Sequence, residues 1–174
     1  MRKQQCLTRG FLVGMVAGLA ASWTMNQFWV VQGKLQKQMS SSESDEKNDQ
    51  QQEQRASDNP TVKVAEAITR PLLHRELSKG EKKTAGSVVH YAFGALVGGL
   101  YGMLSEAMPA ARAGFGIGYG TAVWLGADEG LVPALKLSKP PEEYSLSEHL
   151  SGWGAHLVYG VTAEAVRRGL HAAA

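Results

Sequence analysis

Six ionisable side chains lie within or directly beside long stretches of the chain that carry no charge. They are His90, Glu106, Asp128, Glu129, His156 and Glu164. A histidine that faces a carboxylate can relay protons, because imidazole exchanges a proton near physiological pH and the carboxylate stabilises its protonated form. The same pair could bind a divalent metal ion. A histidine that only hydrogen-bonds a neighbouring helix is the structural alternative.

The uncharged stretches are long enough to cross a membrane. Between Arg9 and Lys34 lie 24 residues without charge, and between Lys83 and Glu106 lie 22. A helix rises about 1.5 Å per residue, so roughly 20 apolar residues span a hydrocarbon core of about 30 Å. We therefore predict an all-α membrane protein, in which ionisable residues at membrane depth are functional candidates by default.

About four transmembrane helices are predicted. They cover residues 11–31, 85–104, 113–127 and 149–166, and the third includes Asp128 and Glu129 only if it extends to Leu135. The first stretch also resembles a cleaved signal peptide, because basic residues precede it. Trp23, Phe28 and Trp29 near its end favour a membrane helix with an interfacial aromatic belt.

Two polar segments separate the first helix (1–31) from a three-helix transmembrane region (85–174). Residues 32–60 are almost free of large apolar side chains and predict a disordered linker. In residues 61–84 apolar side chains recur at four-residue spacing, which predicts an amphipathic segment on the membrane surface. A solvated helix is the alternative there, and Pro71 predicts either a kink or two short pieces.

Helix rise predicts which ionisable residues can meet. Glu106 lies 16 residues beyond His90, about 24 Å along a helix, so the two belong at opposite faces of the bilayer. An antiparallel third helix brings Asp128 and Glu129 back to the level of His90. We therefore expect His90 within hydrogen-bond or single-water range of one of these two carboxylates.

A short repeat places the fourth helix. Residues 101–106 and 159–164 share the pattern Y-G-x-x-x-E. If they share a depth, Glu164 lies with Glu106 beside Arg112, Arg167 and Arg168. The same alignment separates His90 from His156 by about 12 Å in depth, which argues against a haem with two histidine ligands.

Glycines recur every fourth residue in the first two predicted helices, at Gly10, Gly14 and Gly18 and at Gly94, Gly98 and Gly102. Such rows let helix backbones approach closely in lipid, so we expect a glycine-rich helix bundle. Alternatively, the same glycine faces could join copies of the chain into a homo-oligomer. On this basis Gly98→Leu should disrupt packing more than Ala95→Leu. Four glycines between 114 and 120 predict that the third helix sits between two neighbours.

Enzyme, cofactor and nucleic-acid functions find little support. The chain has a single cysteine, Cys6, a net charge of +2 and no P-loop or zinc-protease motif. The segment GFGIGYG lacks the strand and the acidic residue of a dinucleotide site. No nucleophile, base and orienting group can be placed together, so we predict no enzyme activity, no catalytic residue, no metal site, no cofactor and no nucleic-acid partner.

The polar and glycine pattern between about 88 and 168 resembles the YagU-like family of bacterial inner-membrane proteins. The resemblance is carried by His90, the glycines at 94, 98 and 102, Glu106, Trp124, Pro133, His156, Glu164, Arg167 and Arg168. It implies a multi-pass protein of the bacterial inner membrane, with the lipid bilayer as its partner. It implies no activity, cofactor or catalytic residue.

Three function classes remain. The first is a multi-pass inner-membrane protein that passes protons or a small solute, or that supports tolerance of membrane stress. The second is a structural or oligomerising interaction protein, and the third is a haem- or metal-binding redox subunit. The distribution of basic residues favours a cytoplasmic linker by a narrow margin.

Overall fold

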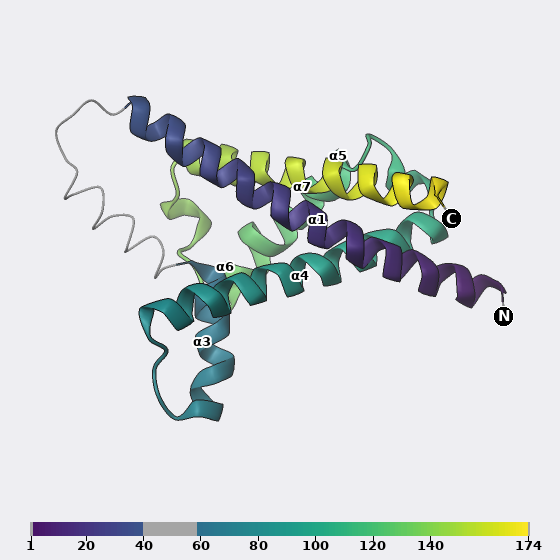
Figure 1. Ribbon diagram of the computed structural model, residues 1–174. Coiled ribbons are helices and arrows are strands. Elements are labelled where there is room, and N and C mark those ends of the chain that lie inside the picture. The colour runs from purple at the N-terminus through teal and green to yellow at the C-terminus, as the bar shows by residue number, and fades with distance from the viewer. Residues whose placement is uncertain (1, 40–58, 174) are drawn as a thin grey trace.

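The computed structural model describes residues 2–39 and 59–173, in which all regular structure is helical (Figure 1). The long helices are α1 (Arg2–Met39), α4 (Lys79–Ala107) and α7 (Leu146–Ala172). Shorter elements are α3 (Pro60–Leu73), η1 (Pro109–Arg112), α5 (Ile117–Val123), η2 (Trp124–Leu131), α6 (Val132–Ala134) and η3 (Pro141–Glu143). Elements η1 and η3 are 3-10 turns, and η2 is a π-helix.

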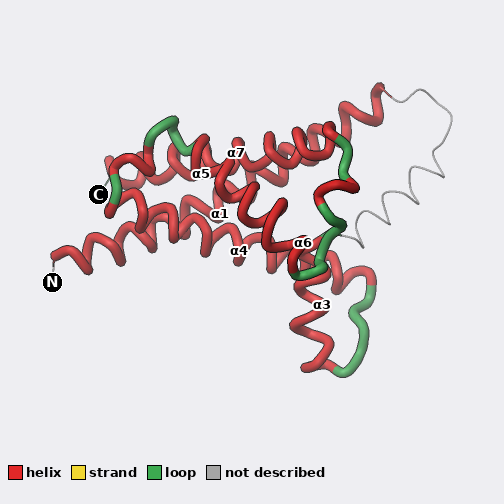
Figure 2. Tube along the Cα trace, turned by 180° about the vertical axis from the view of Figure 1, so that it is seen from behind, coloured by secondary structure: helices red, strands yellow, loops and turns green. Residues whose placement is uncertain are grey.

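Helices α1, α4 and α7 form a bundle in which α1 runs antiparallel to the other two. The chain begins and ends at the same end of this bundle, and α3 lies across its other end (Figure 1). Elements α5, η2 and α6 follow one another directly and form one helical segment, called here the 117–134 stretch, which packs along α7 (Figure 2).

Local signals set the ends of the two long helices that follow the linker. Ser78 and Ser145 each cap a helix and exchange hydrogen bonds with an acid three residues later, Glu81 and Glu148. Such capping boxes satisfy amide groups that the first turn leaves free. Pro109 follows the end of α4, as expected of a residue that cannot continue a helix.

The backbones of α1 and α4 touch where their glycines meet. Gly10, Gly14 and Gly18 face Gly102, Gly98 and Gly94. A Cβ atom added at Gly98 would lie 2.5 Å from the Gly14 carbonyl oxygen and from the Gly18 Cα. Only glycine fits at this distance. Ala95, the residue that the prediction compares with Gly98, is itself buried, with 6% exposure, so the exposed Ala92 of the same helix is the better control.

A second glycine contact joins the 117–134 stretch to α7. A Cβ atom at Gly160 would lie 2.9 Å from the Gly120 amide nitrogen. A Cβ atom at Gly118 would meet nothing within 4 Å. The stretch therefore packs on α7 through one glycine face, and it contacts α4 through Tyr119, whose hydroxyl donates to the Val97 carbonyl.

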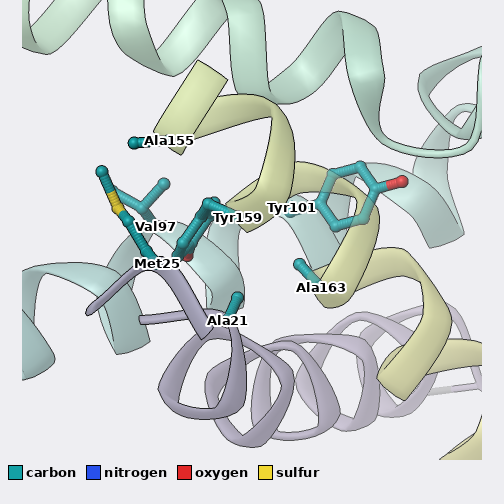
Figure 3. Close-up of a cluster of buried hydrophobic side chains, with 7 residues drawn as sticks. All are labelled: Ala21, Met25, Val97, Tyr101, Ala155, Tyr159 and Ala163. Carbon is teal, nitrogen blue, oxygen red and sulfur yellow. The ribbon is translucent and has the colours of Figure 1, made fainter. Parts of the chain in front are cut away.

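The core combines small residues with two tyrosines. Its buried members are Ala21, Met25, Val97, Tyr101, Ala155, Tyr159 and Ala163 (Figure 3). Large apolar side chains such as Leu12, Leu96 and Leu150 lie exposed on the outside. An apolar exterior around a small-residue core is typical of helices packed in lipid.

Two of the described helices are long and apolar enough to cross a membrane. They cover Gln4–Gln38 and Lys79–Ala107. The other two predicted spans are the 117–134 stretch and α7. Within the described residues, neither is both long enough and apolar enough by the same criterion. The 117–134 stretch does continue past Asp128 and Glu129, as the longer form of the prediction requires.

Two predicted boundaries change. Helix α1 continues beyond residue 31 to Met39, because Gln, Lys and Leu in 32–39 are good helix formers. Residues 40–58 of the predicted disordered linker lie outside the described residues. In the predicted amphipathic segment, α3 includes Pro71 in a single helix that ends at Leu73, and His74 caps it in a left-handed conformation.

Helix α3 rests on α4 through part of its apolar face. Val62 and Ala65 are buried there, and a Cβ atom at Gly86 would lie 2.7 Å from the Val62 side chain. Lys82 of α4 binds Glu66 at 2.8 Å. Ile68 keeps 56% exposure. Part of the face predicted to meet lipid is thus covered by α4.

Candidate functional site

The ionisable residues gather in two clusters along the bundle. The arginine–carboxylate cluster comprises Glu106, Glu164, Arg167, Arg168 and His171. The histidine–carboxylate cluster comprises His90, Asp128, Glu129, His149 and His156. The first lies toward the end of the bundle with the chain termini, and the second lies toward the start of α7.

Glu164 is the centre of the arginine–carboxylate cluster. Its side chain is fully buried, and it accepts hydrogen bonds from Arg167 Nε at 2.8 Å and Nη2 at 3.0 Å. Arg168 Nε donates to it at 2.6 Å, and the Tyr101 hydroxyl donates at 2.9 Å. Four donors around one buried carboxylate hold it in its charged form.

Arg167 connects the two carboxylates of this cluster. Its Nη1 atom lies 3.8 Å from Glu106 Oε1, which is also 3.2 Å from His171 Nε2. Arg112 takes another partner and donates from Nε to the Ser105 carbonyl at 2.9 Å. The structure therefore brings Glu106 and Glu164 to the same arginine.

The π-helix η2 carries both carboxylates of the histidine–carboxylate cluster. Asp128 Oδ2 lies 3.7 Å from His156 Nδ1, and Glu129 Oε1 lies 2.8 Å from His149 Nδ1. His156 is buried, whereas the Asp128 side chain is 48% exposed. A π-helix is uncommon and often marks a functional site. Here it directs two successive acids to two histidines of α7.

His149 has an acceptor at each ring nitrogen. Nδ1 faces Glu129, and Nε2 lies 3.1 Å from the Pro141 carbonyl oxygen. Only the protonated ring can donate to both acceptors at once. His149 thereby ties the loop before α7 to the carboxylate of η2.

The hydrogen-bond partner of His90 is a backbone carbonyl of α1 and neither Asp128 nor Glu129. Its Nε2 atom lies 3.4 Å from the Ser22 carbonyl oxygen on α1. It lies near enough to Asp128 and His156 for an electrostatic interaction with both. The carboxylates make their direct contacts with two histidines of α7, and a water-mediated contact between His90 and Asp128 stays a prediction.

The axial position of α7 brings its histidines to these carboxylates. Tyr101 bonds Glu164, and the Tyr159 hydroxyl donates to the Gly94 carbonyl at 2.6 Å. The repeat suggested that Tyr101 and Tyr159 lie at the same level of the bundle. Instead, Tyr159 contacts α4 at Gly94, before Tyr101 in the chain. In the described residues no three His, Cys, Asp or Glu side chains are placed to hold a metal ion.

Sequence reasoning missed three tyrosines between the clusters. Tyr159 bonds the Gly94 carbonyl, Tyr119 bonds the Val97 carbonyl at 2.7 Å, and Tyr101 bonds Glu164. The rings of Tyr101 and Tyr119 lie 4.5 Å apart. A tyrosine in an apolar stretch is usually interpreted as a core residue. The one sequence signal for a polar role was that Tyr101 and Tyr159 each precede a glutamate, Glu106 or Glu164, by five residues.

Fold and site together define an all-helical protein with two helices able to cross a membrane and paired ionisable side chains between its helices. Residues 49–165 match the family described as "Protein of unknown function (DUF1440)", and the chain belongs to this family. No curated protein and no solved structure matches the chain.

Proposed function

We propose that this protein is a multi-pass, non-enzymatic protein of the bacterial inner membrane that passes protons between its two polar clusters. The resemblance of residues 88–168 to the YagU-like family supports the location. The apolar exterior and the two long apolar helices support a membrane environment. In the full proposal four segments cross the bilayer, namely α1, α4, the 117–134 stretch and α7.

The Asp128–His156 pair carries the proposal. A half-exposed carboxylate lies 3.7 Å from Nδ1 of a buried histidine, and this nitrogen donates to the Gly152 carbonyl oxygen at 2.9 Å. Because Nδ1 already carries a proton, we propose that a proton taken up from water at Asp128 passes to the other ring nitrogen, Nε2. An ionisable pair of this kind in a membrane protein is costly to bury and is usually retained for function.

The three tyrosine hydroxyls supply the next step. They lie at the levels of Gly94, Val97 and Tyr101 on α4, between His90 and Glu106. Each hydroxyl donates to an oxygen atom and keeps lone pairs that can accept from a water molecule. We propose that water between them completes the path to Glu164.

Asp128→Asn should abolish proton flux. The amide keeps the shape of the side chain but cannot bind or release a proton near neutral pH. The full-length protein is reconstituted in liposomes with a trapped pH-sensitive dye, and a potassium gradient with valinomycin drives proton entry. Wild-type protein should acidify the lumen faster than protein-free vesicles, and Asp128→Asn should not.

Glu142→Gln is the matched control, since Glu142 is exposed on η3 and lies outside both clusters. It should leave the flux unchanged, while His156→Gln and His90→Ala should reduce it. A wild-type rate equal to that of empty liposomes would contradict the proposal, as would an undiminished rate in Asp128→Asn.

The oligomerising alternative has less support from the packing. The glycine rows at 10–18 and 94–102 already face each other within one chain. An oligomer would have to use a different surface. For the redox alternative, the described residues offer no cluster of three metal ligands.

A further inference from the structure

A recess of about 490 Å³ opens at the end of the bundle where both chain termini lie. It is lined by Arg112, Arg167, Arg168 and His171. Among residues 2–39 and 59–173, two carboxylates, Glu106 and Glu164, contact these side chains. Within this described part, three guanidinium groups face two carboxylates, so positive charge is in excess in the recess.

Arg112 is held in place through one end of its guanidinium group. Nε donates to the Ser105 carbonyl, and η1 fixes the backbone that carries the side chain. Within residues 2–39 and 59–173 its two terminal nitrogens bind no protein atom. They remain available to a ligand in the recess.

Arg168 is fixed in a similar way from the opposite side. Its Nε atom donates to Glu164, and its guanidinium group lies 4.6 Å from the centre of the Phe115 ring. Phe115 has a φ of 53° between Gly114 and Gly116, whose φ values are 70° and 84°. A left-handed phenylalanine costs backbone energy, and here it places an aromatic face against a cation.

Arg167 differs from these two arginines. Both Nε and Nη2 bind Glu164, and Nη1 points to Glu106. Its role is to neutralise the buried carboxylates. The ligand-binding capacity of the recess therefore rests on Arg112 and Arg168.

We propose that this recess binds a phosphate group through the terminal nitrogens of Arg112 and Arg168. Guanidinium groups match phosphate oxygens through paired hydrogen bonds, and two preoriented groups lose little freedom on binding. The phosphate belongs either to an anionic lipid headgroup, which a basic recess at a helix end can recognise, or to inorganic phosphate. The site does not depend on proton movement.

Calorimetry of the purified full-length protein in an uncharged detergent tests this proposal. The probes are inorganic phosphate and phosphatidylglycerol, compared with sodium chloride at equal ionic strength and with phosphatidylcholine. Binding of phosphatidylglycerol alone identifies a lipid headgroup, and binding of inorganic phosphate identifies a soluble ligand. Binding of neither probe above its comparison would overturn the proposal.

Arg112→Gln should weaken binding about tenfold, as expected for the loss of one charge-assisted hydrogen-bond pair. Arg112→Lys keeps the positive charge but lacks the paired donors of a guanidinium group, so its affinity should fall between that of Arg112→Gln and that of the wild type. Arg9→Gln is the matched control, because Arg9 is exposed at the same end of the bundle and does not line the recess. Circular dichroism checks the fold, and Arg112→Lys replaces Arg112→Gln if the latter does not fold. Wild-type affinity in the folded Arg112 variant, or an equal loss in Arg9→Gln, would refute the site.

Discussion

Glu164→Gln is expected to lower the free energy of unfolding by about 3–5 kcal/mol, the usual cost of breaking a buried ion pair from one side. The Glu164 side chain is fully buried and binds Arg167, whose side chain has 5% exposure. The amide keeps the volume of the carboxylate but leaves the guanidinium group with Glu106 at 3.8 Å as its remaining carboxylate contact. Unfolding by increasing sodium dodecyl sulfate in mixed micelles, followed by tryptophan fluorescence, measures the change.

Three further variants separate charge from packing. Adding Arg167→Met to Glu164→Gln should recover part of the loss, because the uncompensated buried charge is removed. Glu106→Gln should also destabilise the protein, although less, since Glu106 is partly exposed and lies farther from Arg167. Glu142→Gln, on the exposed surface, should have almost no effect. Equal unfolding midpoints for Glu164→Gln and Glu142→Gln would contradict the role given to this cluster.

Gly98→Leu should separate α1 from α4 and cost about 3 kcal/mol or more, at the upper end of overpacking effects. Even the Cβ atom of Gly98→Ala would lie 2.5 Å from the Gly14 carbonyl oxygen and the Gly18 Cα, both of which are backbone atoms. Side-chain rotation cannot relieve such a contact. Both variants should therefore lose monodisperse, folded protein in size-exclusion chromatography after detergent extraction.

Ala92→Leu provides the matched control for this substitution. Ala92 is an exposed residue of the same helix, so a leucine there adds apolar volume without filling the contact with α1. It should elute and unfold like the wild type. If Ala92→Leu and Gly98→Leu behaved alike, close backbone approach would not be what joins the two helices.

Helices and the arginine–carboxylate cluster were accessible from the sequence because their determinants are local. Pro109 follows the end of α4, close to the predicted end at residue 104, whereas the helix starts at Lys79, before the predicted start at residue 85, because Ser78 and Glu81 cap it there. Glu164 and Arg167 are three residues apart, so one helix face brings them together in any packing arrangement.

The partners of Asp128 and Glu129 could not be predicted in the same way. They depend on the axial position of α7 against α4, which is set by contacts such as Tyr159 with the Gly94 carbonyl. They depend also on the π-helix, which changes the direction of both carboxylates and has no sequence signal of its own. The sequence therefore named residues that the fold gathers near η2, but it did not predict that two histidines of α7 contact the two carboxylates.

The position of the two bundle ends relative to the membrane is the most direct test of a multi-pass protein. Cys6, the single cysteine, is exposed in the first turns of α1, and Ser147 is exposed in the first turn of α7. Because α1 and α7 are antiparallel, these residues lie at opposite ends of the bundle. Their accessibility to a membrane-impermeant maleimide can be compared in intact spheroplasts and in inverted vesicles.

We predict that Cys6 in the wild type and the new thiol of Ser147→Cys, made in a Cys6→Ser background, react from opposite sides of the membrane. With a cytoplasmic linker, Cys6 reacts in spheroplasts and the Ser147→Cys variant reacts in inverted vesicles. The reverse assignment would change the orientation and leave the multi-pass arrangement intact. Labelling of both thiols from the same side would contradict a bundle that crosses the bilayer.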